Sequence, residues 1–286
     1  MAKKITIINP HGFCLGVDRA IKLAKNTAIN YPNKTYLLGE IVHNQFVVKD
    51  LENNFKIKTV FSLKEIPKGS AVIIRAHGSS PQTFLEANSL GLTIIDATCP
   101  LVSKVHQDVK KLASENKKIL YIASDLNHDE AVGVQSEAPR SIILTTLKDL
   151  SNLEIKNPQD TFVVTQTTLS VFETEKELAI LKQKYPQITI QPHICDATTQ
   201  RQKSVAKIAK ESDILIIVGS KTSSNSKRLV EVGQTIGVKS FIVESSLDLQ
   251  PEWFTGTNQI AVSSGASTPE NLLYDVIKQI KIILFK

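Results

Sequence analysis

The sequence predicts an α/β protein built from three small domains with mostly parallel sheets. Short, continuously apolar runs alternate with segments of helical spacing along the chain, which is typical of strands covered by helices on both faces. The string Asp-Ala-Thr-Cys at residues 96–99 has a counterpart, Cys-Asp-Ala-Thr, at residues 195–198. One cysteine falls in each third of the chain, at Cys14, Cys99 and Cys195. This pattern indicates three repeated units.

Strands are expected wherever short apolar or β-branched runs occur between turn signals. The expected strands are 5–8, 36–38, 72–75, 93–95, 119–122, 142–145, 162–165, 189–191, 214–218, 241–243 and 260–262. Helical spacing of apolar residues is clearest after Pro100, Ser226 and Pro269. Helices are therefore expected between most of the strands, as parallel sheets require.

This number of strands exceeds what one sheet of such short elements usually holds. We therefore expect three domains, 1–97, 98–193 and 194–286, each with one of the three cysteines. Because no Gly- or Ser-rich linker separates them, the domains are expected to pack closely around a common centre.

The composition excludes several classes of protein. Of the 286 residues, 42% are hydrophobic and 22% are charged, which are ordinary values for a globular chain. No apolar run approaches the ~18 residues of a membrane span, and the N-terminus lacks a signal-peptide core, so a cytoplasmic protein without membrane contact is expected. The net charge of +6 comes from scattered basic residues, and aromatic residues are only 6%. We expect no nucleic-acid binding, but an acidic metabolite or acidic redox partner.

The cysteines are odd in number, far apart and without a C-x-x-C pair, unlike a disulfide framework or a thioredoxin site. Each follows a predicted strand or a short loop and precedes a helix, whose dipole favours a thiolate. Three converging thiolates need a cation to neutralise them. The spacing alone leaves open a zinc ion with a histidine as fourth ligand, an iron–sulfur cluster with one open iron, and three unrelated cysteines.

Other polar groups also follow the predicted strands. His43, His77 and His128 each lie on such a loop, and three histidines in equivalent places indicate an anion-binding set. Segments 219–226 and 263–269 are rich in serine and open helices, so their hydroxyl and N–H groups suit a phosphate. Helix capping explains either segment alone, whereas both together favour a diphosphate. Structural roles, including bonds to Asp or carbonyl groups, are expected for the remaining histidines, His11, His106 and His193.

Glu130 is the best candidate for a catalytic acid. It follows His128 by two residues, and a partly buried carboxylic acid near a cluster can keep its proton near neutral pH. The segment Gln-Thr-Thr-Leu-Ser at residues 166–170 closes another predicted strand. Its hydroxyl groups can relay protons or orient a substrate hydroxyl.

Taken together, these motifs resemble the 4-hydroxy-3-methylbut-2-enyl diphosphate reductase family. The matching strings, in the family's order from Gly12 to Ser267, are GFCLGVDRA, VHN, AHG, DATCPLV, HDE, TQTTLS, ICDATTQRQ, GSKTSSNS and SGAS. The resemblance implies three α/β domains in a pseudo-threefold trefoil around a central [4Fe–4S] cluster. Cys14, Cys99 and Cys195 match its ligands, which leaves one open iron for the substrate hydroxyl.

The resemblance also implies the reaction. It is the reductive dehydroxylation of (E)-4-hydroxy-3-methylbut-2-enyl diphosphate to isopentenyl and dimethylallyl diphosphate, the last step of the methylerythritol phosphate pathway. The residues that match the diphosphate pocket are His43, His77, His128, Ser223, Ser224, Asn225 and Ser267. Glu130 and Thr167 match the proton relay to the substrate hydroxyl, and Thr167 also matches a substrate contact. By the same resemblance, ferredoxin or flavodoxin supplies the electrons to a monomer or homodimer.

Two other functions fit parts of the pattern. Quinolinate synthase also has three α/β units that each donate one cluster cysteine, but the TQTTLS and SSNS strings speak against it. A structural zinc protein or a redox sensor would use the same three thiols, and zinc without acid-labile sulfide would support that function.

Overall fold

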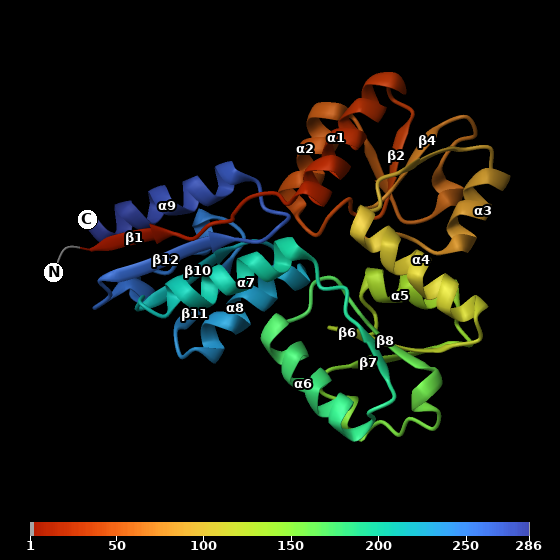
Figure 1. The fold of residues 1–286 in the computed structure, drawn as a ribbon. Coiled ribbons are helices and arrows are strands. Elements are labelled where there is room, and N and C mark those ends of the chain that lie inside the picture. Colours follow the sequence, from red (N-terminus) through yellow and green to blue (C-terminus); the bar gives the residue numbers. More distant parts are fainter. Residues whose placement is uncertain (1–2, 286) are drawn as a thin grey trace. The chain divides into compact units, whose positions relative to one another are not determined.

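The computed structural model describes residues 3–285, which form three four-stranded sheets (Figure 1). Every strand pairing in these sheets is parallel. The mixed α/β class with three parallel sheets, predicted from the alternation of strands and helices, is confirmed. The strands are three to six residues long, which is short for a parallel sheet.

One sheet has the strand order β3–β2–β4–β5. Its strands are β2 (Thr35–Leu38), β3 (Lys58–Val60), β4 (Ala71–Ile74) and β5 (Thr93–Asp96). The helices of this part of the chain are α1 (Leu15–Asn30), α2 (Gln45–Phe55) and α3 (Pro81–Ser89). The central strand β4 is buried along its whole length, which explains its continuous apolar run.

A second sheet has the order β7–β6–β8–β9. Its strands are β6 (Lys118–Ala123), β7 (Ile142–Thr146), β8 (Thr161–Thr165) and β9 (Thr189–Gln191). The accompanying helices are α4 (Pro100–Ser114), α5 (Asp129–Glu137) and α6 (Val171–Lys184). Apolar side chains of α4 pack with those of β6 and β8 in one core, and α6 lies over the other face of the sheet.

The third sheet has the order β1–β12–β10–β11. Its strands are β1 (Lys4–Ile7), β10 (Ile214–Val218), β11 (Lys239–Val243) and β12 (Gln259–Ser264). The helices here are α7 (Asp196–Ala209), α8 (Ser224–Thr235) and α9 (Glu270–Phe285). Short 3₁₀ helices in the chain are Leu63–Glu65, Leu150–Asn152, Pro158–Asp160, Ser246–Asp248 and Pro251–Phe254. The N-terminal strand thus completes a sheet made by the C-terminal third.

The three sheets share one topology. In each, the strand that leads to a cysteine (β5, β9 or β1) lies at an edge and pairs with the third strand of its repeat (β4, β8 or β12). Chain contacts group the described residues into a smaller unit (3–15, 43–47 and 196–285) and a larger unit (16–42 and 48–195). The domain boundaries expected at residues 97 and 193 stay a prediction.

Within residues 3–285, none of the helices is both long and apolar enough to span a membrane.

Candidate functional site

The predicted site residues occupy equivalent loops of the three repeats. In each sheet, the fifth residue after the first strand (β2, β6 or β10) is a predicted diphosphate-binding residue, namely His43, His128 and Ser223. His128 and Ser223 are N-caps: His128 Nδ1 accepts the N–H of Glu130 at 3.1 Å, and the Ser223 hydroxyl accepts that of Ser226 at 3.4 Å. Nδ1 of His128 thus acts as a hydrogen-bond acceptor for the start of α5.

Each cysteine is held by the loop after the third strand of its sheet. The second residue after β4, β8 and β12 accepts the backbone N–H of one cysteine. The three bonds are Cys99 N to Ala76 O at 3.0 Å, Cys195 N to Thr167 O at 3.0 Å, and Cys14 N to Ala266 O at 3.1 Å. The three cysteines are therefore equivalent positions of a structural repeat, which their spacing in the sequence only suggested.

Each cysteine is half-buried and stands at the start of a helix. Cys14 directly precedes α1, Cys195 directly precedes α7, and Cys99 is the N-cap of α4 with Pro100 as the first helical residue. A thiolate is the form of cysteine that binds a soft metal or an iron–sulfur cluster. Cys99 and Cys195 lie in the larger unit, and Cys14 lies in the smaller unit.

Glu130 of the larger unit is a buried carboxyl group with an ordered shell of donors. It is 2% exposed. Its Oε1 accepts the backbone N–H of Thr167 at 2.9 Å and the hydroxyl of Tyr121 at 3.3 Å, and its Oε2 is 2.8 Å from the Thr167 hydroxyl. Desolvation by burial raises the pKa of Glu130, against these hydrogen bonds, which lower it. The arrangement joins a buried carboxyl group to a hydroxyl group.

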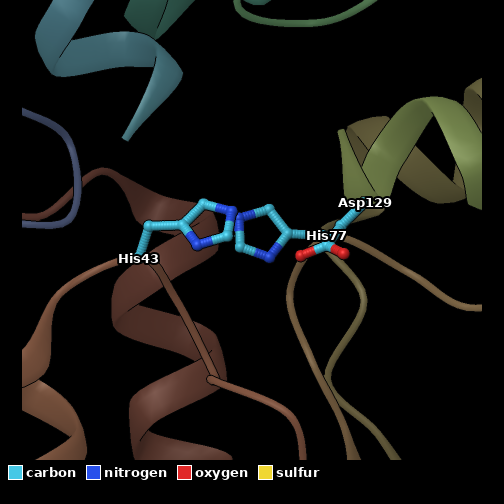
Figure 2. A group of neighbouring side chains, drawn as sticks. All are labelled: His43, His77 and Asp129. Atoms are coloured by element: carbon cyan, nitrogen blue, oxygen red, sulfur yellow. The ribbon is translucent and has the colours of Figure 1, made fainter. Parts of the chain in front are cut away.

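His77 and His128 are brought together in the same unit. Their ring centroids are 5.8 Å apart in an edge-to-face arrangement. Arg75, two residues before His77, forms an ion pair of 2.7 Å with Asp129, the first residue of α5. Figure 2 shows the His77 ring and the Asp129 carboxylate, which come from the loop after β4 and from α5. The ion pair therefore joins the two loops that carry these histidines.

The smaller unit brings together Asn225, Ser267 and the loop of His43. Asn225 Oδ1 accepts the N–H of Ala266 at 3.0 Å, and the Ser267 hydroxyl donates to the His43 carbonyl at 3.3 Å. Asn225 is 5% exposed, and its Nδ2 is buried without a hydrogen-bond partner among the described residues. A buried amide donor left open in this way is suited to an anionic oxygen.

Glu130 and Asn225 are counterparts in the repeat. Each is the seventh residue after the first strand of its sheet, and each accepts the N–H of the second residue after the third strand, Thr167 or Ala266. The repeat thus places an acid in one unit and an amide donor in the other. Ser224, the first residue of α8, lies beside Asn225 in the chain and is half-buried.

Two residues were missed by the sequence analysis, although their side chains bond to Glu130 or to the loop before Cys14. Tyr121 lies in the buried strand β6, where it is indistinguishable in sequence from a core residue, yet it donates to Glu130. Arg201 is 2% exposed in α7, and its guanidinium donates to the Pro10 and Gly12 carbonyls. A basic residue inside the ICDATTQRQ string was the available signal, because a buried arginine must have acceptors.

The remaining histidines are engaged inside the protein. His106 Nδ1 lies 2.8 Å from Glu137, and His193 Nε2 lies 2.8 Å from Asp108. His11 Nδ1 is 3.5 Å from Glu270.

Comparison with known proteins gives one consistent result. The family model described as LytB protein matches residues 5–281. A protein of Wigglesworthia glossinidia brevipalpis named 4-hydroxy-3-methylbut-2-enyl diphosphate reductase is 42% identical over 287 residues, covering 97% of this chain and 90% of that protein. A protein of the same name from Chromobacterium violaceum is 42% identical over 284 residues, covering 98% of this chain and 91% of that protein.

Solved structures agree. That of the E-1-hydroxy-2-methyl-but-2-enyl-4-diphosphate reductase from Plasmodium falciparum has a TM-score of 0.93 and 38% identity, covering 97% of this chain and 88% of that one. Another solved structure is that of (E)-4-hydroxy-3-methyl-but-2-enyl diphosphate reductase, described as the terminal enzyme of the non-mevalonate pathway. It has a TM-score of 0.67 and 32% identity, covering 98% of this chain and 99% of that one.

The protein is therefore of the α/β class and consists of three repeats with parallel sheets. Each repeat has one half-buried cysteine whose backbone N–H donates to the loop after a neighbouring strand. Within that class, the chain belongs to the LytB family.

Proposed function

We propose that this protein reduces (E)-4-hydroxy-3-methylbut-2-enyl diphosphate to isopentenyl and dimethylallyl diphosphate. Relatives of that name are 42% identical over nearly the whole chain. The reaction consumes two electrons and two protons: the allylic C–O bond breaks, the hydroxyl leaves as water with one proton, and carbon takes the other. The observation that carries the proposal is the buried Glu130 carboxyl bonded to the Thr167 hydroxyl, an acid and a relay for the departing oxygen.

The thiols fit an iron–sulfur cluster. Cys14, Cys99 and Cys195 would hold one [4Fe–4S] cluster, because three half-buried thiols at helix starts form a soft, negatively charged donor set. Carboxylate ligands, which hard cations prefer, are not part of this equivalent set. When bound, such a cluster supplies electrons and one iron without a cysteine ligand.

The diphosphate is bound by hydrogen-bond donors from equivalent loops of the repeats. The residues that we assign to it are His43, His77, His128, Ser223, Ser224, Asn225 and Ser267. The open Nδ2 of Asn225 supports this assignment, since it is a buried donor without a hydrogen-bond partner among the described residues. Helix starts at α5 and α8 add favourable dipoles for an anion.

Glu130 delivers the proton to the leaving hydroxyl. Burial raises the pKa of Glu130, which favours its protonated form. In its protonated form, Oε2 donates to the Thr167 hydroxyl, whose own proton then points away from Glu130, toward the substrate oxygen. Thr167 therefore orients the substrate hydroxyl and passes the proton on. This direction of transfer requires no movement of the buried Glu130 side chain.

The electron donor is a ferredoxin or flavodoxin in the cytoplasm. These carriers are acidic, and the net charge of +6 on this chain suits them. The catalytic form is a monomer or homodimer.

The test is anaerobic reconstitution with iron and sulfide, followed by metal analysis and absorption spectra with and without the diphosphate alcohol. About four irons and four sulfides per chain, and a spectrum that changes on substrate addition, are expected. A protein that takes up zinc but neither iron nor sulfide would overturn the proposal.

A further inference from the structure

A cycle of polar contacts links the three cysteine loops. The helix that follows each cysteine carries a charged side chain that bonds to the loop leading into the next cysteine. In α1, after Cys14, Arg19 donates to the carbonyl of Thr98, the residue before Cys99, at 3.1 Å. This is the first of three such contacts, which we call the clamps.

The second clamp lies in the helix after Cys99. Asp108 of α4 is 2.8 Å from Nε2 of His193, which stands two residues before Cys195. The His193 backbone N–H donates to the hydroxyl of Thr165 at 2.8 Å, so the loop is fixed at both its side chain and its backbone. The side chains of His193 and Asp108 are 8% and 20% exposed.

The third clamp closes the cycle. Arg201 of α7, the helix after Cys195, donates to the Pro10 carbonyl at 2.8 Å and to the Gly12 carbonyl at 2.9 Å. Both carbonyls lie in the loop that leads to Cys14. With 2% exposure, Arg201 is a buried charge whose guanidinium spans two backbone acceptors in a way that a shorter or uncharged side chain does not reproduce.

We propose that Arg19, the Asp108–His193 pair and Arg201 are positioning residues for the metal centre, an inference that rests on the proposed function. In each clamp, the loop of one cysteine is held by a side chain from the helix that begins at another. Groups that orient metal ligands typically control metal affinity by about 10- to 100-fold. Polar contacts are stronger where they are buried, so the three clamps should differ in how much they slow the loss of iron. We expect Arg201 to contribute most, Asp108 less, and the exposed Arg19 least.

The test measures iron release from the reconstituted full-length protein to a ferrous chelator under anaerobic conditions. The variants are Arg201→Gln, Arg201→Lys, Asp108→Asn and Arg19→Gln, with Arg140→Gln, an exposed arginine outside the clamps, as the control. We expect Arg201→Gln to release iron at least about tenfold faster than the unchanged protein. Arg201→Lys keeps the charge but reaches only one carbonyl, so its rate of iron release should lie between those of Arg201→Gln and the unchanged protein. Arg140→Gln should release iron at the rate of the unchanged protein.

Circular dichroism during release separates positioning from folding. The clamps are supported if iron leaves the Arg201→Gln protein while its far-ultraviolet spectrum is unchanged. The proposed role of the clamps would be overturned if the Arg201→Gln protein released iron at the rate of the unchanged protein. It would also be overturned if iron left only in step with the loss of helix signal. If the ranking holds but the loaded protein does not convert the diphosphate alcohol, the proposed function fails and the clamps stand. A chain that takes up neither iron nor sulfide overturns both.

Discussion

At the scale of single residues, the proposed catalytic acid is Glu130. A carboxyl that is 2% exposed loses most of its hydration, and burial raises its pKa although three hydrogen bonds oppose the shift. Its counterpart in the repeat is Asn225, which makes the equivalent backbone contact but leaves an amide N–H open. One position of the repeat therefore carries an acid, and its equivalent carries a neutral donor.

Glu130→Gln should reduce turnover by at least about a hundredfold, because an amide N–H is far too weakly acidic to give up its proton. The glutamine carbonyl can still accept the Thr167 N–H, so fold and cluster content should be kept. Steady-state rates measure the loss of turnover, and iron analysis of the same preparation measures the cluster content. Turnover within a factor of two of the unchanged protein would show that another group is the acid.

Tyr121→Phe should extend activity to higher pH. In the proposed mechanism Glu130 acts in its protonated form, so we expect turnover below the pKa of Glu130 and a loss of turnover as pH rises through it. The Tyr121 hydroxyl lowers that pKa, and removing it raises the pKa further. The rate–pH profile should therefore shift toward higher pH on its alkaline side. Tyr36→Phe, in a different sheet, is the matched control, and a shift to lower pH would contradict this role of Tyr121.

Asn225→Asp should weaken substrate binding. The carboxylate can still accept the Ala266 N–H, but it replaces an open donor with a negative charge, which would repel the diphosphate in the proposed site. We expect KM for the substrate to rise at least about tenfold, which corresponds to about 1.4 kcal/mol. Asn152→Asp, at an exposed position, should leave KM unchanged. An unchanged KM in Asn225→Asp would remove this residue from the binding set.

The residues that sequence reasoning could identify share one property: their chemistry is unusual for the place where they stand. Three cysteines before helices and three histidines after strands are examples. Tyr121 and Arg201 were missed because their importance lies in their partners, Glu130 and the Pro10 and Gly12 carbonyls. Such partners are distant in sequence, and no local pattern encodes them.

At the scale of elements, short apolar runs predicted eleven strands, while the described residues contain a twelfth, β3 (Lys58–Val60). Lys-Thr-Val has a single apolar residue, Val60, which is buried in the core, and β3 lies at an edge of its sheet, so the sequence carries no apolar run that predicts this strand. The buried strand β10 was predicted with its observed bounds because both of its faces are covered.

The Arg75–Asp129 ion pair joins two such elements, the loop after β4 and the start of α5. Arg75→Ala and Asp129→Ala should each raise KM, because the spacing of His77 and His128 loosens. The double variant should be little worse than either single variant. Since both side chains are 27% exposed, the expected coupling is about 1 kcal/mol, or roughly fivefold in KM.

The matched control for this cycle is the Lys117–Asp160 pair, an ion pair of 2.7 Å that lies away from the predicted site residues. Its variants should leave KM unchanged. Strictly additive effects of Arg75→Ala and Asp129→Ala on KM would contradict a shared positioning role.

At the scale of the whole molecule, the repeat is the organising feature. Each sheet ends at an edge strand that leads to a cysteine, and the last sheet is completed by β1 from the start of the chain. The sequence indicated three units through its cysteine spacing. It did not reveal that β1 pairs with β12, because pairing between opposite ends of a chain leaves no local signal.

The central claim is tested most directly by product analysis. The iron–sulfur-loaded protein, held anaerobically with an excess of a chemically reduced viologen, is given (E)-4-hydroxy-3-methylbut-2-enyl diphosphate, and consumption of reductant is measured beside the products. We predict isopentenyl and dimethylallyl diphosphate, with two electrons consumed per product molecule. A loaded protein that returns the substrate unchanged while the viologen stays reduced would contradict the proposed function.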